Sequence, residues 1–173
     1  RLGFHVVAVE PFAENAALLR GTSALLEMDQ GNVGGRGPRG LIDVVWAAAA
    51  ASTSARLAIQ VPNKENAGHA VVHAVGDARH AHLPAVTLDH IAADFQVCAI
   101  KLDVEGFELQ VLQGAQQLLR PGSSVAMVFL EIVPALHTST DREVVDLVHW
   151  FGKRNYSLCL VSNGKLDRLC KVD

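Results

Sequence analysis

The stretch that most constrains the fold is AIKLDVEGFELQVLQGA, at residues 99–115. It opens with a short apolar run, interrupted only by Lys101, that has the length of a buried parallel strand. Three acidic residues follow within six positions, namely Asp103, Glu105 and Glu108. Apolar residues then recur at spacings of three and four, which predicts a helix that continues to residue 119. A strand, an acidic turn and a helix in this order predict an α/β fold, in which ligands bind beyond the carboxyl ends of the strands.

The three acids have two interpretations from the residues alone. Helices commonly begin with acidic residues, so Glu105 and Glu108 suit the positive end of a helix dipole and Asp103 suits a cap. Alternatively, the carboxylates face a ligand, and Gly106 between them allows a sharp turn or a close approach of the backbone. The pattern by itself leaves both interpretations open.

A second acid stands at the end of another predicted strand. Residues 4–9, FHVVAV, are apolar and largely β-branched, and Glu10 and Pro11 follow them. In folds that bind dinucleotides or adenosine, an acid at the tip of the second strand accepts hydrogen bonds from ribose hydroxyls. A surface acid at a strand end is the other interpretation. Pro11 suits the first turn of a helix, which we predict to run to residue 26 although Gly21 weakens its middle.

The remaining pattern alternates short strands with helices. The predicted strands are residues 41–48, 56–61, 70–75 and 125–132, and the predicted helices are residues 86–91, with Thr87 as cap, and 144–151. A last hairpin from residue 157 turns at Asn163 and Gly164. The glycine-rich residues 31–40 lack the spacing of a phosphate-binding loop and are predicted to be a linking loop.

Composition narrows the class of protein. A chain of 173 residues, half of them apolar, predicts one domain over residues 1–173. A net charge of −3 gives no footprint for nucleic acid, and no apolar run is long enough to span a membrane.

The histidines and cysteines predict neither metal nor disulfide. The pairs His69 with His73 and His80 with His82 do not suggest a metal site. The three cysteines are widely spaced, which favours a reducing, cytoplasmic setting, and Cys98 and Cys159 read as core residues.

Three phrases resemble one known family. IKLDVEGFELQVLQGA at residues 100–115, VVAVEPFAENAALL at residues 6–19 and the Thr-Leu-Asp at residues 87–89 are similar to the FkbM-type methyltransferases. The resemblance implies S-adenosylmethionine as cofactor and methylation of a hydroxyl on a small-molecule, sugar or lipid acceptor. It also implies a Rossmann-like class I sheet with helices on both faces and an antiparallel C-terminal hairpin.

The resemblance also implies roles for particular residues. Those assigned to the cofactor are Glu10, Pro11, Trp46 and Ala47. Those assigned to the reacting centre are Asp103 and Glu105, where a carboxylate within reach of the acceptor hydroxyl is a suitable general base. Those assigned to the acceptor are Glu108, Glu131 and Asn66. No metal ligand is assigned.

One part of the family pattern is not found in these residues. Enzymes of this class begin with a strand and a glycine-rich turn around the cofactor, whereas here the sequence starts at the strand that carries Glu10. We therefore expect a domain that is incomplete at its N-terminus, and a non-catalytic remnant with a binding or structural role is the alternative function. A nicotinamide-dependent oxidoreductase shares the acid at the second strand tip but does not explain the acidic residues 103–108.

Overall fold

A computed structural model of the chain describes residues 5–30, 41–60, 71–77, 79, 82–131, 141–162 and 165–170. The chain forms two compact units, Arg1–Val86 and Thr87–Asp173, and each is described by itself. That the two units make one domain stays a prediction.

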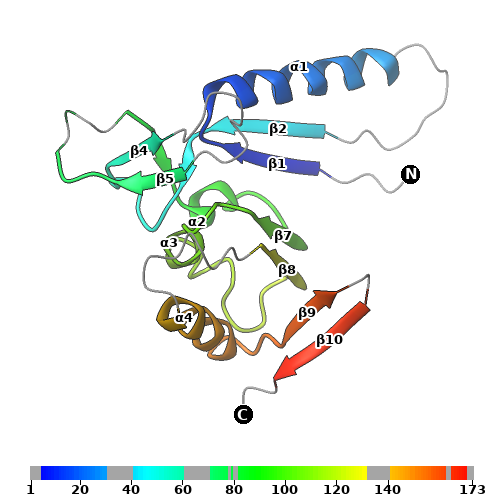
Figure 1. Cartoon of the computed structure of the whole chain (residues 1–173). Helices are drawn as coiled ribbons and strands as arrows, with labels where there is room; N and C mark the ends of the chain where they lie inside the picture. The colour runs from blue at the N-terminus through cyan, green and yellow to red at the C-terminus, as the bar shows by residue number, and fades with distance from the viewer. Residues whose placement is uncertain are drawn as a thin grey trace. The chain divides into compact units, whose positions relative to one another are not determined.

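The first unit is built on two parallel strands and one long helix. Strand β1 (His5–Glu10) pairs with β2 (Leu41–Trp46) in a register that runs from His5 opposite Leu41 to Glu10 opposite Trp46. Helix α1 (Ala13–Gln30) packs along these strands (Figure 1). The predicted strand before Glu10 and the predicted helix after Pro11 are thus confirmed, and the helix runs through Gly21 without a break.

The rest of the first unit consists of short strands. Strand β3 (Ala48–Ala49) pairs in parallel with β6 (Ala85–Val86), and β4 (Leu57–Gln60) pairs antiparallel with β5 (Val71–Ala74). The chain bends at Ala47, so the single strand predicted for residues 41–48 is two strands with different partners. The described buried apolar residues of this unit are mostly small: Ala16, Ala47, Ala48, Ala50, Leu57, Ala58 and Leu83.

The second unit contains the predicted strand and acidic turn. Strand β7 (Ala99–Leu102) pairs in parallel with β8 (Met127–Leu130), and helix α3 (Glu108–Gln113) follows β7. Helix α2 (Leu88–Ile91) begins at Thr87, whose hydroxyl accepts a hydrogen bond from the His90 N–H at 3.1 Å. The predicted cap is therefore confirmed.

Helix α3 is shorter than the apolar spacing predicts. It ends at Gln113, with Gly114 as its C-cap, and turns take the place of the helix predicted up to residue 119. The reason is a tertiary contact, because the Asp89 carboxylate accepts hydrogen bonds from the N–H groups of Gln117, at 3.0 and 3.1 Å, and Leu118, at 2.8 Å. These backbone groups bond to a side chain 28 and 29 positions away instead of continuing the helix.

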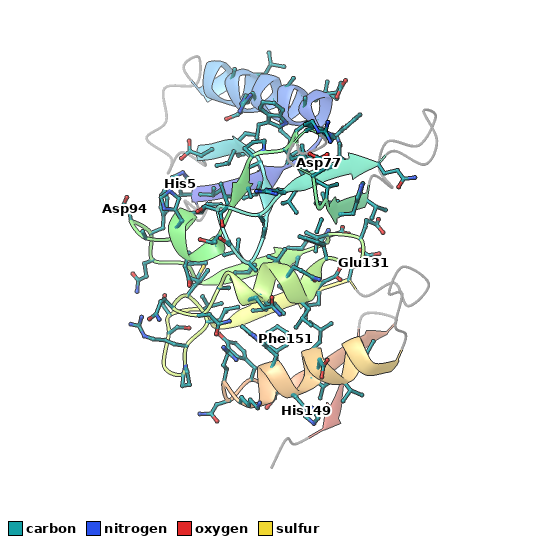
Figure 2. The ribbon with its side chains drawn as sticks, turned by 90° about the vertical axis from the view of Figure 1, so that its left-hand side faces the viewer. His5, Asp77, Asp94, Glu131, His149 and Phe151 are labelled. Carbon is teal, nitrogen blue, oxygen red and sulfur yellow. The ribbon has the colours of Figure 1, made fainter. Side chains whose placement is uncertain are left out.

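Helix α4 (Asp141–Gly152) supplies the largest buried side chain among the described residues of the second unit. Phe151 is 2% exposed and points from α4 into the unit, whereas His149 lies on the other side of the helix (Figure 2). The turn that follows α4 contains a left-handed residue, Asn155, at φ 64°, and the Tyr156 N–H donates back to the Phe151 carbonyl at 3.2 Å. This arrangement is a common way to satisfy the last carbonyls of a helix.

The chain ends in an antiparallel pair, β9 (Leu158–Ser162) with β10 (Lys165–Cys170). The predicted hairpin is confirmed, but its turn at residues 163–164 lies outside the described residues. The prediction that Cys98 and Cys159 are core residues is wrong, since both are exposed free thiols. In the apolar run that follows Cys98, only Leu102 is buried.

The described strands pair two by two into five small sheets. A mixed α/β architecture is therefore confirmed. One continuous Rossmann-like sheet with helices on both faces stays a prediction, and the predicted linking loop at residues 31–40 lies outside the described residues.

Candidate functional site

Glu10 lies at the carboxyl end of β1, as the sequence predicts. Its Oε1 accepts a hydrogen bond from the Phe12 N–H at 2.7 Å, so the carboxylate fixes the entry of the chain into α1. Its other oxygen, Oε2, makes no hydrogen bond with any described residue. The side chain is half-buried. One carboxylate oxygen thus holds the backbone, and the other is left to accept hydrogen bonds from a ligand.

Trp46 is the residue opposite Glu10 in the parallel register of β1 and β2. The indole Nε1 donates a hydrogen bond to the Pro11 carbonyl at 3.1 Å, which fixes the ring, yet the residue is 43% exposed. An apolar core position, the ordinary interpretation of a tryptophan in such a run, is thereby excluded. A tethered and partly exposed ring is suited to stack on a flat ligand.

Pro11 and Ala47 complete this group, which we call the Glu10 corner: Glu10, Pro11, Trp46 and Ala47. The Ala47 N–H donates to the Glu10 carbonyl at 3.3 Å, and its methyl group is buried at 1% exposure. Pro11 is half-buried and offers its carbonyl to Trp46. These two residues shape the Glu10 corner through the backbone, while Glu10 and Trp46 provide the side chains that a ligand can contact.

A second group of acids lies in the other unit, at the carboxyl ends of β7 and β8. Asp103 follows β7, Glu131 follows β8, and the Glu131 N–H donates to the Leu102 carbonyl at 3.1 Å. The two parallel strands therefore bring Asp103 and Glu131 to the same edge of their sheet. This agrees with the expectation that ligand-binding groups gather beyond the carboxyl ends of strands.

Lys101 is the immediate partner of Asp103. The Lys101 Nζ lies 2.8 Å from Asp103 Oδ2, and the two side chains are 68% and 38% exposed. The hydrogen bond to Asp103 raises the pKa of the Lys101 ammonium, the charge of Asp103 adds to the shift, and the charge of Glu131 contributes less. The ammonium thus experiences both carboxylates of this edge. Lys101 donates its hydrogen bond to Oδ2, and Asp103 Oδ1 makes no hydrogen bond with a described residue.

The acidic turn, residues 103–108, has a strained backbone. Glu105 has φ 50° and Gly106 has φ 92°, and the Phe107 N–H donates to the Val104 carbonyl at 3.2 Å. Two consecutive positive φ angles form a tight turn that glycine adopts freely and glutamate adopts at a cost of roughly 1 kcal/mol. Such strain is typical of functional sites, so Glu105 remains a candidate for the reacting centre.

Glu108 has a structural position. It is 0% exposed, and its Oε1 accepts a hydrogen bond from the Gly106 N–H at 3.3 Å. The side chain therefore closes the acidic turn from within, and contact with an acceptor would require that turn to open. The cap of α3 is Phe107, which makes no side-chain hydrogen bond there, so Asp103 does not act as the helix cap.

Some of the residues that the sequence singles out lie outside the part of the chain that the structure describes. Asn66 lies outside the described residues, as do His69 and His80. In the described ranges, no group of three or more His, Cys, Asp or Glu side chains is placed to hold a metal ion. No described helix is long and apolar enough to cross a membrane.

Sequence reasoning missed Lys101, the partner of Asp103, and the tertiary contact that Asp89 makes. Lys101 reads as an interruption of an apolar strand, although the alternation of a strand places positions 101 and 103 on one face, which could have indicated the pair. The Asp89 carboxylate accepts hydrogen bonds from the backbone N–H groups of residues 117 and 118. No local pattern indicates a contact across so many positions.

Each unit has an acidic residue at the carboxyl end of a parallel strand. This arrangement is typical of the broad class of α/β proteins that bind ligands beyond the carboxyl ends of their strands. Comparison with protein families narrows this class, because the model of the methyltransferase FkbM domain matches residues 1–158. The chain therefore belongs to the FkbM methyltransferase family, as its motifs predict. The matched range includes the Glu10 corner and the acidic turn. No curated protein and no solved structure matched the chain.

Proposed function

We propose that the chain is an S-adenosylmethionine-dependent methyltransferase that methylates a hydroxyl oxygen of a small-molecule, sugar or lipid acceptor. The observation that carries the proposal is the Glu10 corner in a chain of the FkbM family: a carboxylate oxygen without a described partner beside a tethered, partly exposed indole. This pair suits the two parts of an adenosine group, since ribose offers hydroxyl donors and adenine offers a flat face.

The side chains of the Glu10 corner suit the adenosyl part of the cofactor, because one accepts hydrogen bonds and the other has a partly exposed flat ring. Glu10 Oε2 would accept hydrogen bonds from the ribose hydroxyls, and the Trp46 ring would pack against the base. Pro11 and Ala47 would keep these two side chains in place through their backbone bonds. When bound, S-adenosylmethionine supplies a methyl group on a positively charged sulfur.

Asp103 is the residue we assign to proton removal. Its Oδ1 would accept the proton of the acceptor hydroxyl as the oxygen becomes methylated, and the proton would then pass to water. The Lys101 ammonium on Oδ2 would hold the carboxylate in one orientation. Glu105, in its strained turn, would face the same centre. Glu131 and Asn66 would contact the acceptor, and the buried Glu108 would act indirectly, by holding the acidic turn closed.

The experiment is a methyl-transfer assay with labelled S-adenosylmethionine and a panel of hydroxylated acceptors, followed by the Asp103→Asn variant. Removal of a general base should lower kcat by roughly 10²–10⁴ while cofactor affinity changes little. Asp94→Asn is the matched control, because Asp94 is an exposed acid of the same unit that precedes β7, on the opposite side from Glu131 (Figure 2). Equal losses in both variants, or no transfer to any acceptor, would overturn the proposal and leave a non-catalytic binding role.

A further inference from the structure

The second unit contains a hollow that the proposed methyl transfer does not use. It has a volume of about 390 Å³ and lies between the segment before β8 and the segment before β9. Pockets that hold small ligands have volumes of roughly 300–1,000 Å³, so the hollow is large enough for one. Its walls contain two arginines, Arg120 and Arg154, and none of its described lining residues is acidic.

The positive charge at the hollow is not balanced by an acidic side chain among the described lining residues. The whole chain carries a net charge of −3, yet two of the residues that line this hollow are arginines. Neither arginine forms an ion pair with a described residue, and the Arg120 side chain is exposed. An anion that enters the hollow would therefore meet positive charge without displacing a carboxylate.

Arg154 is held in place by neutral groups. Its Cζ lies 3.6 Å from the centroid of the Trp150 ring, one guanidinium nitrogen donates to the Trp150 carbonyl at 3.1 Å, and another bonds to Gln116 Oε1. These contacts fix the plane of the guanidinium and leave its charge whole. A guanidinium fixed in this way loses little conformational freedom when it binds an oxyanion.

Two hydroxyl groups complete the wall. The Tyr156 hydroxyl donates to the Val125 carbonyl at 2.8 Å, which ties the two lining segments together. The Ser123 hydroxyl oxygen is buried and makes no hydrogen bond with described residues, so its rotation toward a ligand would break no described bond. The left-handed turn at Asn155 places Arg154 and Tyr156 at the end of α4.

We propose that this hollow binds the phosphate group of a small phosphorylated ligand. A phosphate monoester carries a charge of about −1.5 to −2 at neutral pH, which two guanidinium groups balance, and arginine donates paired hydrogen bonds to phosphate oxygens. The remaining volume accommodates the organic part of the ligand.

The proposed site is separate from the candidate catalytic acids. The hollow precedes β8, whereas Glu131 follows it, and the four residues of β8 span about 13 Å at roughly 3.3 Å per residue. The ligand would bind as an additional group and not as the methyl acceptor at Asp103.

The test is a calorimetric titration of the full chain with inorganic phosphate and with glycerol 3-phosphate, at constant ionic strength set with chloride. We expect saturable binding that Arg154→Gln and Arg120→Gln each weaken by about tenfold, because each removes one charge-assisted pair. Lys153→Gln is the matched control, since it removes an adjacent exposed positive charge outside the hollow and should change the affinity by less than about twofold.

Arg120→Gln also guards against misfolding, since its side chain has no described partner to lose, and thermal unfolding of each variant shows whether the fold is kept. Tighter binding of glycerol 3-phosphate would identify a phosphorylated organic ligand, and equal binding would identify the phosphate ion itself. Absence of saturable binding, or equal weakening by Lys153→Gln and the two pocket variants, would overturn the proposal.

Discussion

Replacing Glu10 by glutamine tests the Glu10 corner directly. Glutamine keeps an oxygen that can accept the Phe12 N–H bond, now 2.7 Å from Glu10 Oε1, but it loses the charge and replaces one acceptor by a donor. A hydrogen bond to a charged group contributes about 1.5–3 kcal/mol. Because Glu10 is half-buried, we take about 2 kcal/mol, which corresponds to a roughly 30-fold higher Kd for S-adenosylmethionine.

Isothermal titration calorimetry with S-adenosylmethionine measures this change. Glu14→Gln is the matched control, since it removes the same charge from an exposed position in the first turn of α1 and should change Kd by less than about twofold. Thermal unfolding of both variants separates a loss of affinity from a loss of structure. Saturable binding with the same Kd in the Glu10→Gln variant and the parent chain would refute the assignment of Glu10 to the ribose.

Three further predictions concern the scaffold around the sites. Gly21→Ala should raise the free energy of unfolding by about 0.5–1 kcal/mol in a urea titration, because Gly21 lies in the middle of α1 and an added methyl group meets no atom within 4 Å; a lower value would contradict this. Asp89→Asn should lower the free energy of unfolding by about 1–3 kcal/mol and speed amide hydrogen exchange at Gln117 and Leu118. Asp94→Asn should change neither quantity. Unchanged exchange in the Asp89→Asn variant would show that the Asp89 hydrogen bonds do not hold these residues. The hydrogen bonds from Arg79 lower the pKa of Asp77. The pair therefore stabilises the fold above the ordinary Asp pKa of 3.8, and this contribution is lost as the pH falls through the lowered pKa. An NMR titration should show a higher Asp77 midpoint in the Arg79→Gln variant, and an unchanged midpoint would exclude the pair in solution.

Local patterns predicted much of the fold because neighbouring residues decide it. The apolar run before Glu10, the helix after Pro11 and the cap at Thr87 all depend on contacts within a few positions. The strand and the acidic turn around Asp103 follow from the same kind of signal. The starts of these elements agree with the sequence to within one or two residues, whereas α1 ends at Gln30, four residues beyond the predicted end at residue 26.

Other features depend on partners that are distant in the sequence. The apolar spacing up to Leu119 is helical, but the Asp89 carboxylate binds the backbone N–H groups of the Gln117–Leu118 pair and the helix ends early. The exposure of Cys98 and Cys159 likewise depends on which parts of the fold cover these positions, which the apolar runs alone do not indicate.

The candidate site was only partly predictable for the same reason. The sequence indicated Glu10 and Trp46 separately, and the parallel register of β1 and β2 brings them side by side. It did not indicate that Trp46 would be exposed, nor that Lys101 would pair with Asp103. The roles of these residues in cofactor binding and proton transfer stay predictions that the variants above test.

The fluorescence of Trp46 offers the most direct measurement of the central claim, that the Glu10 corner binds the adenosyl group. The chain has two tryptophans, so Trp150→Phe leaves Trp46 as the sole indole. Titration of this variant with S-adenosylhomocysteine should change the Trp46 emission saturably, because the base would stack on the partly exposed ring. An emission that stays constant up to millimolar ligand would contradict the account.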